Sequence, residues 1–97
     1  MATMIAPAFA AEWISDFDAA KAKAAQENKA ILADFTGSDW CGWCIRLRQS
    51  VLDTPAFEAY AKDKFVLAEI DVPQAPKLSP EQMQKNRLLC EQYNIQG

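Results

Sequence analysis

The chain contains no histidine, and only three of its 97 residues are cysteine. Without histidine, no mechanism can use an imidazole as a general base, as the partner of a catalytic cysteine or as a metal ligand. Three cysteines are also too few for a framework of disulfide bonds, because they leave one pair and one single residue. Cysteine is therefore the main reactive side chain to follow along this sequence.

Positive charge is scarce as well. The 10 lysines and arginines are outnumbered by 13 aspartates and glutamates, the formal net charge is −3, and no long basic run occurs. Proteins that bind nucleic acid or an anionic membrane surface usually carry a basic patch, so we expect neither partner. Since 51% of the residues are apolar, the chain is predicted to form one small globular domain.

A long apolar run is also missing, although residues 1–10 carry no charged side chain and end in Ala8, Phe9 and Ala10. This small-x-small pattern is typical of a signal-peptidase site, so residues 1–10 are predicted to be the end of an export signal. The alternative is a disordered alanine-rich tail, because the basic start of a signal is absent and the stretch is too short to span a bilayer. Export would place the chain, without a membrane span, in a bacterial periplasm or outside the cell, where disulfides form.

Two strands are predicted from nearly continuous apolar runs, at residues 30–36 and 65–71. The first run contains a single carboxylate, Asp34, and is typical of a central strand that is buried on both faces. Because helices are predicted between and around the strands, we expect a parallel α/β sheet with a right-handed crossover. The carboxyl end of the first strand is then a favourable position for a functional site.

The helices are predicted from their capping residues and apolar spacing. Ser15 is expected to cap a helix that continues to about Asn28, and Thr54 and Ser79 are expected to cap two helices that begin with proline. A further helix is predicted over residues 41–52, with three residues on one apolar face, namely Cys44, Leu47 and Val51.

Cys41 and Cys44 are separated by two residues and follow the first predicted strand through a short loop. If Cys41 lies at the start of a helix, Cys44 lies one turn later and both sulfurs are at the same helix end. The free amides at that end favour a thiolate at Cys41, which makes it both a nucleophile and a leaving group. The pair is therefore spaced for reversible disulfide chemistry.

The segment from Asp34 and Phe35 to Cys44 resembles the active-site segment of the thioredoxin-fold family. It is most similar to bacterial exported thioredoxin-like proteins that carry Gly-Ser-Asp-Trp-Cys-x-x-Cys. The resemblance extends from about Trp13 to Gly97 and includes Ile70 and Asp71 at the end of the second strand. It implies a thioredoxin-like α/β fold and thiol-disulfide exchange on protein disulfides, which is the activity of a protein-disulfide oxidoreductase.

The resemblance also implies roles for individual residues. Cys41 matches the attacking cysteine, Cys44 the resolving cysteine, and Trp40 the tryptophan that borders the active-site surface. Asp34 is similar to the buried acid that assists proton transfer when Cys44 is activated, and a structural acid bound to loop amides is the alternative. The lysine that accompanies this acid in the family corresponds here to Leu67, so we expect an unpaired carboxyl with a raised pKa.

Gly42 and Trp43 stand between the cysteines, where reducing thioredoxins carry Gly-Pro and strong oxidants and isomerases carry a histidine next to the second cysteine. Without that histidine, a reductase or isomerase-like role is favoured over the donation of disulfides. Trp40, Gly42 and Trp43 are the candidate substrate-binding residues, with loop packing as the alternative for Trp43. The implied partners are client proteins with disulfides and a thiol-disulfide electron donor, and no metal or organic cofactor is implied.

In the family, the chain continues past the position of Gly97 into a cis-proline loop, two strands and a helix. Residues 11–97 are therefore expected to form a partial thioredoxin-like domain, which has the N-terminal βαβα part and lacks those last two strands and the helix. The strand at residues 30–36 would then present an open edge, through which copies of the chain would associate.

Three alternatives remain open at this point. Cys90 lies on a helical stripe with Met83 and Asn86 and is expected to be a buried, inert thiol, with redox sensing or intermolecular pairing as the alternative. A zinc site with Cys41, Cys44 and Cys90 is disfavoured, because no second pair of closely spaced cysteines supplies the usual four ligands. The alternative function is a redox-inactive, degenerate thioredoxin-like binding module.

Overall fold

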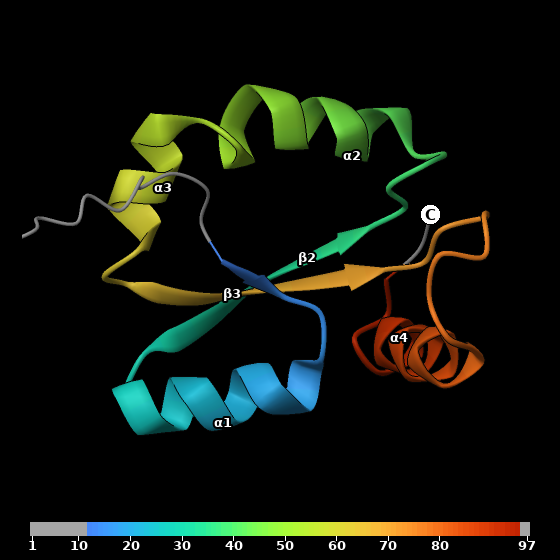
Figure 1. Ribbon diagram of the computed structural model, residues 1–97, viewed down its shortest axis with the longest axis horizontal. Helices are drawn as coiled ribbons and strands as arrows, with labels where there is room; N and C mark the ends of the chain where they lie inside the picture. Colours follow the sequence, from blue (N-terminus) through green and yellow to red (C-terminus); the bar gives the residue numbers. More distant parts are fainter. Residues whose placement is uncertain (1–11, 96–97) are drawn as a thin grey trace, which may run out of the picture.

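Three parallel strands form the sheet in a computed structural model that describes residues 12–95 (Figure 1). The strand order is β1-β3-β2, where β1 is Trp13–Ile14, β2 is Ala30–Thr36 and β3 is Phe65–Asp71. Both pairs are parallel, and the two longer strands pair along their whole length from Ala30 opposite Phe65 to Thr36 opposite Asp71. The predicted parallel α/β arrangement is confirmed, and the predicted signal remnant at residues 1–10 lies outside the described residues.

The central strand is β3, which corrects the expectation that residues 30–36 would be buried on both faces. In β3, Val66, Leu67, Ala68 and Ile70 are buried, whereas the residues of β2 are mostly half-buried. Within residues 12–95, β2 pairs on one side only, and β1 occupies the far side of β3. The two-residue β1 was not predicted, because it is too short to show any periodicity.

Helices cover both faces of the sheet (Figure 1). On one face lie α1, Phe17–Glu27, and α4, Pro80–Gln92. The buried Ala20 and Ala24 of α1 pack against Val66, Ala68 and Ile70 of β3, and Ile31, Ala33 and Phe35 of β2 extend this cluster. Asp16, and not Ser15 as predicted, caps α1 by accepting a hydrogen bond from Asp18 N at 3.0 Å.

Helix α4 is tied to the carboxyl end of β3 by a buried amide. Asn86 is 1% exposed, and its Nδ2 donates to the carbonyl oxygen of Asp71 at 2.7 Å. Gln82 Nε2 in turn donates to Asn86 Oδ1 at 2.8 Å, so the buried amide has partners for both of its ends. Ser79 caps this helix as predicted, by accepting from Gln82 N at 3.1 Å.

The other face carries α2, Gly42–Leu47, the π-helical segment η1, Arg48–Leu52, and α3, Pro55–Ala61. Thr54 caps α3 as predicted. The predicted helix over residues 41–52 forms, but the expected apolar face is not buried, since Leu47 is 45% and Val51 44% exposed. The π turn explains the exposure of Val51, because a wider turn rotates the residues after Arg48 and buries Leu52 instead.

None of the helices within residues 12–95 combines the length and the apolar character needed to cross a membrane.

Candidate active site at the Cys41 and Cys44 pair

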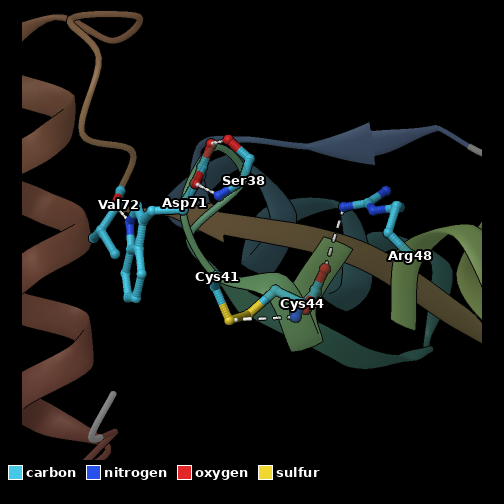
Figure 2. The surroundings of a disulfide bond; sticks show 8 residues. Ser38, Cys41, Cys44, Arg48, Asp71 and Val72 are labelled. Carbon is cyan, nitrogen blue, oxygen red and sulfur yellow. Dashed lines mark hydrogen bonds and ion pairs between the residues drawn. A yellow bond between two sulfur atoms is a disulfide. The ribbon is translucent and has the colours of Figure 1, made fainter. Parts of the chain in front are cut away.

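The loop from β2 to α2 is shaped by a tight turn at Gly37. Its carbonyl oxygen accepts hydrogen bonds from Trp40 N at 3.1 Å and from Cys41 N at 2.9 Å. A side chain at Gly37 would collide with the indole of Trp40, so only glycine allows the ring to lie against the backbone here. The indole Nε1 then donates to the carbonyl oxygen of Val72 at 2.8 Å (Figure 2).

Two carboxylates fix this loop to the end of β3 and to the segment that follows it. Asp71 accepts from Ser38 N at 2.9 Å and from Ser38 Oγ, as Figure 2 shows. Asp39 accepts from Gln74 N at 2.8 Å and from Ala75 N at 2.9 Å, and these backbone hydrogen bonds lower the pKa of Asp39. The cysteine pair therefore follows a loop that is anchored at two adjacent residues, Ser38 and Asp39.

Cys41 and Cys44 form a disulfide with their Cα atoms 5.2 Å apart (Figure 2). Cys41 is the N-cap residue of α2, and its Sγ accepts a hydrogen bond from Cys44 N at 3.2 Å. The predicted placement of Cys41 at the start of the helix and Cys44 one turn later is therefore confirmed. In the reduced protein, the same amide would stabilise negative charge on the sulfur of Cys41.

Asp34 lies on the face of β2 that is turned toward α2, because its neighbours Ala33 and Phe35 pack toward α1. Its side chain is only 9% exposed, and burial raises the pKa of Asp34 above its ordinary value, as predicted. The carboxyl is not unpaired, however, since its Oδ2 lies 3.2 Å from Nη2 of Arg48 (Figure 2). The prediction of an unpaired carboxyl is thus wrong, and the positive charge of Arg48 opposes the effect of burial on the pKa of Asp34.

Arg48 also contacts a second acid. The same Nη2 atom lies 2.8 Å from Oε2 of Glu69, which is the register partner of Asp34 on β3. The guanidinium lies 4.3 Å from the ring centroid of Trp13 in β1, and Nη1 is 3.6 Å from Oδ1 of the exposed Asp53. Burial also raises the pKa of Glu69, and the nearby Arg48 opposes that shift.

A groove of about 460 Å³ lies beside the disulfide. Both cysteines of the pair contribute to its wall, together with Trp40 from the loop and Cys90 and Ile95 from the C-terminal side. Cys90 is partly exposed in the groove, which corrects the expectation of a fully buried thiol, although burial still raises the pKa of Cys90.

The two residues between the cysteines point away from packed structure. Apart from its chain neighbours and the backbone of its own helix, no atom lies within 4 Å of the position that a Cβ on Gly42 would take. Trp43 is 77% exposed, and the guanidinium of Arg46 lies 5.0 Å from its ring centroid. The Trp43 side chain is therefore largely accessible to a partner, with Arg46 as its one described cation contact.

A known family matches most of the described region. The family described as thioredoxin-like matches residues 12–93. The chain belongs to the thioredoxin-like family. A solved structure of a DsbH oxidoreductase superposes on this chain with a TM-score of 0.82 and is 35% identical in sequence. The superposition covers 98% of this chain and 67% of the DsbH chain. The predicted thioredoxin-like fold class is thereby confirmed.

Two curated proteins of Chlamydia pneumoniae are also similar to this thioredoxin-like chain. The disulfide bond reductase DsbH is 40% identical over 72 residues, which make up 74% of this chain and 43% of DsbH. The thioredoxin-related protein DsbJ is 36% identical over 59 residues, which make up 61% of this chain and 17% of DsbJ. The chain thus spans less than half the length of either curated relative.

No group of three or more metal-ligating side chains is assembled within residues 12–95.

Proposed function

We propose that this protein exchanges thiols and disulfides with client proteins, as a reductase or isomerase, through Cys41 and Cys44. The observation that carries the proposal is the disulfide at the start of α2, with Cys41 Sγ accepting from Cys44 N at 3.2 Å beside an open groove. Similarity to a disulfide bond reductase over 74% of the chain supports it.

In the proposed reaction, the thiolate of Cys41 attacks one sulfur of a client disulfide and releases the other client sulfur as a thiolate. Cys44 then loses its proton, and its thiolate attacks the Cys41 sulfur of the mixed disulfide. The second client thiolate leaves, and the bond between Cys41 and Cys44 forms. The client gains two electrons and the cysteine pair loses two, which a thiol-disulfide electron donor restores.

Asp34 is proposed to accept the proton from Cys44. The carboxyl lies on the sheet face below α2, is shielded from solvent and has a raised pKa, so it is a better base near neutral pH than an exposed aspartate. Its ion pair with Arg48, which lies one helical turn after Cys44, links the carboxyl to the helix that carries the thiol.

The client is proposed to lie in the groove beside the disulfide, against Trp40, while Gly42 leaves the approach to the sulfurs open and the exposed Trp43 offers an apolar contact. We propose export to a bacterial periplasm or the cell exterior as the setting, because disulfides of client proteins persist in such compartments.

Variants in which one cysteine is replaced by serine test the proposal. Reduced Cys44→Ser protein should accumulate a mixed disulfide with a disulfide-bonded peptide, detected as a mass increase on Cys41, because the resolving thiol is missing. Cys41→Ser should form far less, and Cys90→Ser should reduce the peptide like the unmodified protein. If the unmodified protein forms no mixed disulfide and reduces no peptide, the proposal fails and the redox-inactive binding module remains.

A further inference from the structure

Arg48 carries one positive charge, and three acids contact its guanidinium, namely Asp34, Asp53 and Glu69. One nitrogen, Nη2, contacts both Oδ2 of Asp34 at 3.2 Å and Oε2 of Glu69 at 2.8 Å. The two carboxyl groups therefore lie within a few ångströms of each other, on adjacent strands and in direct register. Like charges at this separation do not ionise independently.

Arg48 lies closer to Glu69 than to Asp34. Glu69 makes the shorter contact, and the Arg48 side chain is held in place by the Trp13 ring at 4.3 Å. With Glu69 ionised, the pair of Glu69 and Arg48 is neutral, and an ionised Asp34 is a surplus charge in a site that is mostly closed to water.

We propose that Glu69 and Arg48 are positioning residues that set the proton affinity of Asp34, with Glu69 taking up the charge of Arg48 so that Asp34 accepts a proton readily. This inference rests on the proposed function, in which Asp34 receives the proton of Cys44. When Asp34 is protonated, the remaining Glu69 and Arg48 carry no net charge, so the proton transfer moves the surplus negative charge from the acids to the sulfur of Cys44, which then attacks the mixed disulfide.

Two further acids lie near this unit. Strand β3 also supplies Asp71, whose oxygens are engaged by Ser38, and Asp53 follows η1 with a half-exposed side chain 3.6 Å from Arg48 Nη1. Both additional acids favour the protonated form of Asp34. Arg48 begins the π-helical segment, and such local departures from α-helical geometry often accompany functional sites.

The test follows the two thiol steps separately. Reduced protein is mixed with an aromatic disulfide such as Ellman's reagent, which releases one coloured thiolate when Cys41 attacks and a second when Cys44 resolves the mixed disulfide. The rate of the second release is measured from pH 4.5 to pH 9 for the unmodified protein and for Glu69→Gln, Arg48→Gln and Arg48→Lys. Asp53→Asn is the matched control, because it removes an acid that contacts the same guanidinium from the solvent side.

On the acid limb of this profile, the rate of the second release falls as the pH decreases. Glu69→Gln and Arg48→Gln, which each remove one charge, should shift this limb in opposite directions. Glu69→Gln frees Arg48 for Asp34 and should move the limb down by about 1 pH unit, whereas Arg48→Gln should move it up by about as much. Arg48→Lys should restore most of the unmodified profile, and Asp53→Asn should shift it much less than Glu69→Gln. The first release should keep its rate in every variant.

A limb that stays in place or moves up in Glu69→Gln would overturn the inference. If Arg48→Gln does not fold, carbon NMR titration of the Asp34 carboxyl in Glu69→Gln decides alone, and an unchanged midpoint overturns the inference as well. The failure of the proposed function looks different. An absent second release refutes the exchange reaction. An acid limb that persists in Asp34→Asn refutes Asp34 as the base. Either result also refutes the inference about Glu69 and Arg48.

Discussion

Replacing Asp34 with asparagine keeps the shape of a side chain that is 9% exposed but removes its ability to accept a proton. We expect Asp34→Asn to slow the resolution of the mixed disulfide by about 100-fold at pH 7, at the low end of the range for general base catalysis. This factor corresponds to about 2.7 kcal/mol in the activation free energy. The effect should shrink as the pH approaches about 8.5, where a cysteine thiol ionises without assistance.

The two-step release of a coloured thiolate in a stopped-flow instrument measures this prediction directly. The first release reports the attack by Cys41 and should be unchanged, and the second reports the resolution by Cys44 and should be slow. Asp53→Asn is the control, because it makes the same chemical change at an acid that also contacts Arg48 but is 53% exposed. Equal second-phase rates in Asp34→Asn and in the unmodified protein would refute the reasoning and leave Asp34 with a structural role.

Three further predictions concern other parts of the account. In the reduced protein, iodoacetamide should modify Cys41 faster than Cys44 and Cys90 near pH 7, as measured by peptide mass spectrometry. Cys90 should react slowly because burial raises the pKa of Cys90. Faster labelling of Cys90 than of Cys41 would contradict the assigned roles. Because burial raises the pKa of Asp34 above 3.8, the stability that this group contributes is present below that value and is lost as the pH rises through the folded-state pKa. The Tm of the unmodified protein should therefore fall more between pH 4 and pH 7 than the Tm of Asp34→Asn, and an equal fall would count against the assignment. Since β2 pairs on one side only within residues 12–95, sedimentation velocity should detect self-association that increases with protein concentration, and a monomer at every concentration would refute it.

The elements that could be predicted from the sequence are those with local signals. Thr54 and Ser79 could be predicted as helix caps because each is followed by proline and a helix-forming segment. The apolar run at residues 65–71 likewise predicted a strand, which is the most buried of the sheet. The order of the strands depends on contacts over long distances, so β1 was beyond a local pattern, and the open edge of β2 was expected from the family resemblance and not from the local pattern. The π turn at Arg48–Leu52 likewise departs from a period of 3.6 residues, which is why Val51 is exposed and Leu52 is buried.

The same distinction applies to the candidate site. The spacing of Cys41 and Cys44 after a strand is a local feature, and it predicted their position at the start of α2. Arg48 was not predicted as the partner of Asp34, because the family resemblance places the cation at the position of Leu67 on β3, whereas here the cation comes from η1. A useful signal was present, since Arg48 lies four residues after Cys44 and an acid pair stands at corresponding positions of the two strands.

The central claim is that Cys41 and Cys44 exchange two electrons with a client disulfide. The most direct measurement is a single turnover of the reduced protein with an excess of a disulfide-bonded peptide, followed by acid quenching, alkylation and mass spectrometry. We predict that each protein molecule reduces one peptide disulfide to two thiols, forms the bond between Cys41 and Cys44, and leaves Cys90 as a free thiol. A peptide that stays oxidised, or a reduction that consumes Cys90 in place of Cys41, would contradict the claim.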